Sequence, residues 1–209
     1  MHLYRLTPRS FVHVDPVTVK RAMWDLMGLG ADTPRDWLWR ADVERGKPVV
    51  NLLTPREPQD PRRLWDIEPL VWPPPLSAGQ RVGFRLRFGA HTLKGSNHNG
   101  RGTRRRSLYD AVTDGMTRQE REFAGESEIA RVVYGSWLRD HLAGADLDPR
   151  TLVVERLPVI HVREKLPVHH VEISGTLIVG EPSALVQRIE SGFGTQKSWG
   201  GGLMVLTHG

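Results

Sequence analysis

The sequence predicts an α+β fold made of two tandem ferredoxin-like, RNA-recognition-type domains. Both halves contain strands that alternate apolar and polar residues, and in both a strand leads through an amphipathic helix to another strand. A polar, glycine-rich stretch at 95–102 separates the halves and is typical of a linker or loop. We therefore expect an N-terminal domain at 1–93 and a C-terminal domain at 94–209.

The first half begins with an alternating strand at 2–7, followed by a helix at 16–27. Asp15 is a good N-cap and Pro16 suits the first helical position, so this helix has a clear start. Further strands are expected at 37–43, 48–53 and 81–88.

Two further features of the first half are the placement of its tryptophans and a proline-rich stretch. Trp37 and Trp39 alternate on one expected strand, so both point to one face and are expected in the core. Repeated prolines between 55 and 75 predict little regular structure there, apart from a short helical piece near Leu64.

The second half contains a helix at 127–142 whose apolar residues form a stripe. Near the C-terminus a helix starts at Pro182, and a glycine-rich loop at 192–202 leads into the last strand. The expected strands of this half lie at 152–157, 159–163, 168–179 and 203–206.

The composition narrows the class of protein. The 209 residues include no cysteine, so a disulfide framework and a thiolate metal site are excluded. No apolar run approaches the roughly 18 residues of a membrane span, and the first residues carry no signal-peptide pattern. We expect a cytoplasmic protein with no membrane partner, no cofactor and no metal site.

Positive charge is the main hint of a partner. The net charge is +5, and several basic residues cluster in short stretches. Each cluster taken alone is compatible with a solvated face, but together they favour binding to nucleic acid phosphates. The proposed contacts are Arg21, Arg101, Arg104, Arg105, Arg106, Arg156, Arg163 and Lys165.

The loop at 192–202 is the most informative motif, because five glycines fall within eleven residues. Backbone N–H groups of such a loop can hold a phosphate chain, although a flexible turn before the last strand is the alternative. Trp199 inside the loop either stacks on a base or packs beneath the loop. The expected RNA-binding residues of the loop are Gly194, Lys197, Ser198 and Gly200.

This loop resembles the C-terminal signature of the CasE family, the CRISPR RNA-processing endoribonucleases of type I-E systems. The family has two glycines, a Lys-Ser or Lys-Ala pair, and a Gly-x-Gly-Leu start to the last strand. Gly192, Gly194, Lys197, Ser198, Gly200, Gly202 and Leu203 fill these places. The strand at 2–7, the Trp-Leu-Trp-Arg segment at 37–40 and the Phe-Arg-Leu-Arg run within 79–87 also fit in order.

The resemblance implies an endoribonuclease that needs neither metal nor cofactor. It implies binding to the stem-loop of CRISPR repeat RNA (crRNA) and cleavage at the base of the stem by attack of a 2′-hydroxyl. The enzyme would then stay on its product and join other subunits of a CRISPR ribonucleoprotein complex.

The first helix departs from the family pattern at two places. The family carries a tyrosine and, three residues later, a histidine, where this chain has Val17 and Lys20. Lys20 suits a fixed cation beside the scissile phosphate, because a lysine base needs its pKa lowered from about 10.4 toward 7. His13 is the alternative base. The other interpretation is that His13 is a surface or helix-capping residue without a catalytic role.

Two other functions stay open. A catalytically inactive subunit that caps the RNA hairpin within a CRISPR surveillance complex is favoured by Val17 and Lys20. A generic two-domain RNA-binding protein requires no family assignment.

Overall fold

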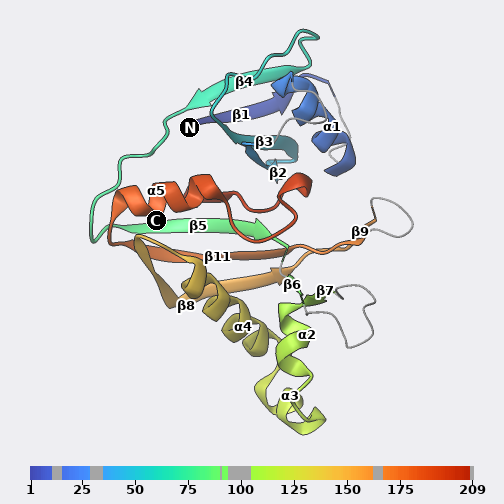
Figure 1. The fold of residues 1–209 in the computed structure, drawn as a ribbon, viewed down its shortest axis with the longest axis vertical. Helices are drawn as coiled ribbons and strands as arrows, with labels where there is room; N and C mark the ends of the chain where they lie inside the picture. The colour runs from blue at the N-terminus through green and yellow to red at the C-terminus, as the bar shows by residue number, and fades with distance from the viewer. Residues whose placement is uncertain (11–15, 29–34, 90, 94–104, 162–166, 208–209) are drawn as a thin grey trace.

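The computed structural model describes residues 1–10, 16–28, 35–89, 91–93, 105–161 and 167–207. These residues form two four-stranded antiparallel sheets with helices, stacked along the long axis of the molecule (Figure 1). The predicted α+β class with tandem ferredoxin-like domains is confirmed. None of the described helices has the length and apolar character of a membrane span.

The first sheet has the strand order β2-β3-β1-β4 and is covered on one face by helix α1 (Pro16–Met27). Val19 and Met23 of this helix pack in a core with Trp37 and Trp39, which confirms the expected burial of both indoles. The strands are β1 (His2–Pro8), β2 (Leu38–Glu44), β3 (Lys47–Thr54) and β4 (Trp65–Leu70).

Strand β4 corrects the expectation for the proline-rich stretch. Instead of a helical piece near Leu64, the chain forms a strand that pairs with β1 in antiparallel register, with Pro69 opposite Tyr4. A proline is tolerated there because β4 is the edge strand, where a missing N–H costs no pairing with a further strand.

The second sheet has the strand order β12-β5-β11-β8, which is the same order as in the first sheet read from its β4 edge. Its apolar residues pack against helices α4 (Glu126–His141) and α5 (Pro182–Ser191), close to the helices expected from the sequence. The strands are β5 (Arg81–Phe88), β8 (Ala145–Arg156), β11 (Val171–Val179) and β12 (Met204–Thr207).

The expected domain boundary at 93/94 differs from the pairing of the strands. β5 pairs with β11 and β12 of the second sheet, so the change of sheet falls between β4 and β5, at 71–80. The sequence predicts β5 in the first half because the glycine-rich stretch at 95–102 has the composition of a linker. That stretch instead follows the first strand of the second fold in the chain, and all of it lies outside the described residues.

The insertion after β5 contains short elements that the sequence did not predict. Helices α2 (Leu108–Thr113) and α3 (Arg118–Ala124) are N-capped by Ser107 and Thr117, and α3 buries none of its residues. Without an apolar stripe, such helices give no periodic signal. The remaining elements are β6 (His91–Leu93), β7 (Arg105–Ser107), β9 (Ile160–His161), β10 (Pro167–Val168) and the 3-10 turn η1 (Lys197–Trp199).

Helix α5 lies between the two sheets (Figure 1). Leu185 and Ile189 of α5 belong to one apolar cluster with Leu38 and Leu53 of the first sheet and with the core of the second sheet. The two halves therefore share a core rather than only touching at their surfaces.

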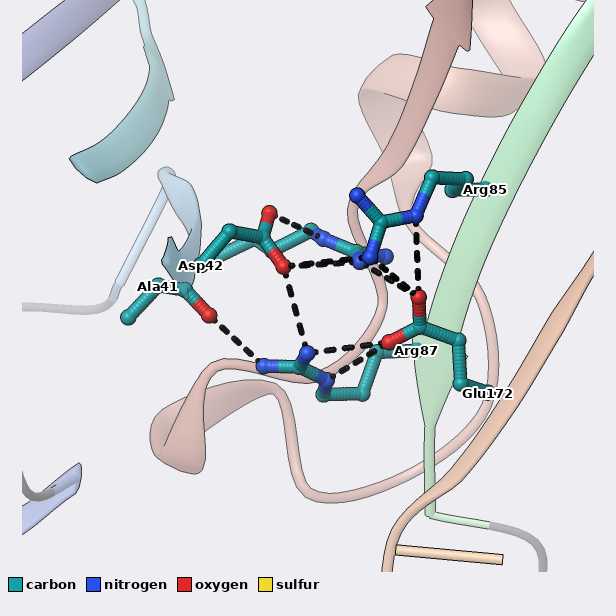
Figure 2. Close-up of polar contacts among 6 residues, drawn as sticks. Ala41, Asp42, Arg85, Arg87 and Glu172 are labelled. Atoms are coloured by element: carbon teal, nitrogen blue, oxygen red, sulfur yellow. Dashed lines mark hydrogen bonds and ion pairs between the residues drawn. The ribbon is translucent and has the colours of Figure 1, made fainter. Parts of the chain in front are cut away.

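A group of five charged residues also joins the halves (Figure 2). Its carboxylates and Arg40 are buried, whereas the Arg85 side chain is 46% exposed. Arg40 of β2 is fully buried, and its guanidinium donates to Asp42 at 2.6 and 2.8 Å and to Glu172 of β11 at 2.8 Å. Arg85 and Arg87 of β5 donate to the same Glu172 at 2.7 and 2.9 Å. We call these residues the interdomain ion cluster.

Electrostatics hold Glu172 in its ionised form within this cluster. Burial would raise the pKa of Glu172, but Arg40, Arg87 and Arg85 outweigh it and lower the pKa to about 2. A carboxyl whose pKa is lower in the folded state stabilises the fold above its unfolded pKa and loses that contribution as pH falls through the folded value.

Glu172→Gln is expected to destabilise the protein by about 3 kcal/mol at pH 7, because it leaves the buried Arg40 undercompensated. Urea unfolding measures this loss. In wild type, the contribution of Glu172 should decline between about pH 4.5 and pH 2, so the two proteins should converge in stability over that interval.

Glu44→Gln is the matched control, because the side chains of the Glu44–Arg5 pair are 42% and 37% accessible, whereas that of Glu172 is 7% accessible. Its loss should cost less than about 1 kcal/mol. Equal losses for the two variants would contradict a structural role of the interdomain ion cluster.

Candidate functional site

The glycine-rich loop between α5 and β12 is hydrogen-bonded to the second domain. The N–H of Gly202 donates to the carbonyl of Arg87 at 2.7 Å, and the hydroxyl of Thr195 donates to the carbonyl of Gly89 at 2.8 Å. These bonds hold the loop at the end of β5. The loop is therefore part of the packed structure rather than a loose connection.

Gly200 shows why the loop requires glycine. Its φ of +82° lies in the left-handed region, and a Cβ atom there would stand 2.8 Å from the ring of Trp39 in β2. The backbone thus lies directly on an indole of the first domain. The position of the loop depends on the relative placement of the two halves.

Lys20 of α1 meets this loop. Its ammonium nitrogen lies 4.0 Å from the ring centroid of Trp199, within the range of a cation–π contact. Trp199 is half-buried, and one of its faces is thus turned to a cation of α1. The structure brings the expected catalytic residue of the first half together with the expected RNA-binding loop of the second.

Lys197 is the second cation of the loop. Its ammonium donates to the carbonyl of Ser191, the last residue of α5, at 2.6 Å. Partial burial lowers the pKa of Lys197, and the positive charges of Arg188 and Arg35 lower it further. Ser198, the next residue of the expected motif, is exposed.

Arg188 was not predicted as part of the site. Its guanidinium donates to the carbonyl of Gly192 at 3.1 Å and to the hydroxyl of Ser191 at 2.7 Å, and it lies 4.1 Å from the ring centroid of Phe193. A basic residue in the last turn of a helix is the only signal the sequence offered, and that signal normally indicates a helix cap.

The other expected RNA contacts lie apart from the loop or outside the described residues. Arg21 is exposed on α1, and the guanidinium of Arg156 lies 3.8 Å from the ring centroid of Tyr109 in α2. Arg105 and Arg106 belong to β7 by their backbone. His13, Arg101, Arg104, Arg163 and Lys165 lie outside the described residues.

Chemically, the junction of α1 and the loop offers two ammonium groups. Lys20 and Lys197 both supply fixed positive charge, which is suited to a phosphate or to a phosphorane formed during its cleavage. Among the described residues, no three His, Asp or Glu side chains are grouped so that they could hold a metal ion.

Comparison with protein families matches residues 4–208 to a family described as "CRISPR associated protein". The chain belongs to this CRISPR-associated family. The CRISPR-associated family indicated by the sequence resemblance is thereby confirmed. A search of curated proteins found no match.

Solved structures of CRISPR proteins share the fold of this family member. Cse3 of Thermus thermophilus, bound to an RNA representing a pre-cleavage complex, is 22% identical with a TM-score of 0.71, and the match covers 99% of this chain and 98% of that chain. Cas6e of Escherichia coli K-12 is 18% identical with a TM-score of 0.68 over 100% of both chains. A chain of a CRISPR RNA-guided surveillance complex is 18% identical with a TM-score of 0.60, again over 100% of both chains.

Gly200→Ala should destabilise the protein more than Gly79→Ala, by about 1–3 kcal/mol, because only the first variant forces a methyl group against Trp39. Gly79 is a matched control, since its φ of +80° is nearly the same and a Cβ there meets no atom within 4 Å. Urea unfolding of both variants provides the measurement. Equal losses would show that the loop does not rest on Trp39 as described.

Proposed function

We propose that this CRISPR-associated protein binds the stem-loop of CRISPR repeat RNA and cleaves it at the base of the stem without a metal. The observation that carries the proposal is the contact between Lys20 of α1 and Trp199 of the glycine-rich loop. It puts a cation at the helix position where the CasE family has its histidine, next to the family's glycine-rich motif. The fold shared with Cse3, a protein solved in complex with RNA, supports the same function.

The proposed reaction is an in-line attack of a 2′-hydroxyl on the adjacent phosphorus. It yields a 2′,3′-cyclic phosphate, and the leaving 5′-oxygen takes up a proton. Lys20 stabilises the negative charge of the phosphorane, a role that requires the lysine to stay protonated. Arg21 on the next position of α1 adds positive charge, and His13 is the candidate for proton transfer.

Binding is assigned to cations on both domains. The proposed phosphate contacts are those expected from the sequence, including Arg156 and the loop residues Gly194, Lys197, Ser198 and Gly200. RNA stems are recognised mainly by shape and backbone, so these residues act through charge. We also propose that the protein stays on its product as a cytoplasmic subunit of a CRISPR ribonucleoprotein complex.

The second candidate is a subunit that caps the RNA hairpin without cutting it. Val17 and Lys20, which replace the family's tyrosine and histidine, favour this function. The fold shared with a chain of a CRISPR RNA-guided surveillance complex is compatible with it. Cleavage remains our preferred function because the histidine is replaced by a cation rather than by an inert side chain.

Purified protein incubated with its own repeat RNA in EDTA should produce two fragments, one ending in a cyclic phosphate and one beginning with a 5′-hydroxyl. Denaturing gels and phosphatase or kinase treatment identify these ends. If the RNA is tightly bound but stays uncut, the nuclease proposal is contradicted and the hairpin-capping function is supported.

Lys20→Ala is expected to slow single-turnover cleavage by about 10²-fold or more, with RNA affinity nearly unchanged, because one preorganised cation is lost from the transition state. Lys20→His should preserve the rate and add a pH dependence near 6 to 7. Lys47→Ala, at the exposed first residue of β3, is the control for loss of a lysine charge. If Lys20→Ala cuts like wild type while His13→Ala does not, the catalytic role belongs to His13.

A further inference from the structure

We propose a phosphate-binding subsite formed by Arg35, Arg188 and Lys197, where the start of β2 meets the end of α5 and the glycine-rich loop. Arg35 and Arg188 were not among the residues expected to bind RNA. As a subsite for RNA it rests on the proposed function, but the anion-binding chemistry can be tested without RNA.

Arg188 and Lys197 are brought together by the end of α5. Lys197 donates to the carbonyl of Ser191, and Arg188 donates to the hydroxyl of Ser191 and to the carbonyl of Gly192. Gly192 provides the space for this arrangement, because a Cβ there would lie 3.2 Å from Cε of Lys197. The two cations are thus held by adjacent residues of one turn.

The segment that carries Arg35 reaches the same turn from the first domain. The same Cβ position on Gly192 is 2.8 Å from Leu38, which lies three residues after Arg35 and belongs to the shared core. The positive charge of Arg35 contributes to the lowered pKa of Lys197, which places the two cations within electrostatic reach. Nη1 of Arg35 is buried and has no hydrogen-bond partner.

Capping of α5 explains only part of this arrangement. Cations near the carbonyl end of a helix are favourable, so Arg188 and Lys197 are partly compensated by the carbonyls they contact. Arg35 lies in the segment before β2 and contacts no carbonyl of α5 among the bonds of the described residues. Arg35 therefore adds a third positive charge near a helix end that Arg188 and Lys197 already cap. Its buried Nη1 has no hydrogen-bond partner.

No carboxylate balances the three charges within the described part of the chain. The acidic neighbours in sequence are engaged elsewhere: Asp36 pairs with Arg56 at 2.7 Å, and Glu190 pairs with the N-terminal amine at 3.2 Å. The unpartnered Nη1 of Arg35 and the two cations at the end of α5 are suited to an anion with several acceptor oxygens. A phosphate meets this need, because it accepts from a guanidinium fork and from an ammonium at the same time.

A phosphodiester of the RNA stem is the ligand we infer. The subsite lies where both domains meet the loop that also contacts Lys20, so one strand can reach both places. Arg35→Gln should lower affinity for the repeat hairpin roughly tenfold. It should also reduce the slope of log affinity against log salt by about 0.7–0.9, the value for one phosphate contact.

Fluorescence anisotropy at several salt concentrations measures both quantities. Arg118→Gln is the control, because Arg118 is 92% exposed on α3 and pairs only with Glu122 of its own helix. Arg35→Lys keeps the charge and should keep the salt slope, which distinguishes lost charge from lost folding. If Arg35→Gln and Arg118→Gln both match wild type in affinity and slope, the subsite is refuted while the proposed function stands.

A second experiment measures the melting temperature of wild type and Arg35→Gln with inorganic pyrophosphate at constant ionic strength. Wild type should be stabilised by pyrophosphate and Arg35→Gln should not. If wild type fails to bind the hairpin but shows this difference, the proposed function fails and the anion subsite stands. If wild type fails to bind the hairpin and pyrophosphate stabilises wild type and Arg35→Gln equally, both the proposed function and the subsite are refuted.

Discussion

The ion pairs between Arg40, Glu172 and their neighbours set the geometry on which the site depends. They connect β2 of the first sheet with β5 and β11 of the second through the buried carboxylate of Glu172. Arg87 contributes its guanidinium to this cluster and its backbone carbonyl to Gly202 of the glycine-rich loop. Loss of the cluster would therefore shift the loop relative to Trp39 and α1, although none of its charges needs to touch RNA.

Much of the fold could be predicted because it depends on local patterns. The strand β5 and the helices α1, α4 and α5 were found within a few residues, since each alternates or carries an apolar stripe. β4 was missed because its proline argued against a strand, and only its place at the sheet edge explains the tolerance. The assignment of β5 to the second sheet required knowledge of long-range pairing.

The site was predictable in its motifs but not in its contacts. The glycine pattern identified the loop, and the family pattern pointed to Lys20, yet nothing in the sequence indicated that Lys20 lies on Trp199. Arg40 and Glu172 gave no signal either, because charged residues in alternating strands are normally expected on a solvated face. Their burial follows from the packing of one domain on the other, which no local pattern records.

The position of α5 determines whether the two halves can be separated into independent domains. Its apolar residues belong to one core with Leu38 and Leu53, so the face that each half buries is partly supplied by the other. We therefore expect the two repeats of the same topology to unfold together, because each loses part of its core when the other unfolds. An isolated half would expose that apolar face to water and become prone to association, so neither half is a self-sufficient module that could be exchanged between relatives.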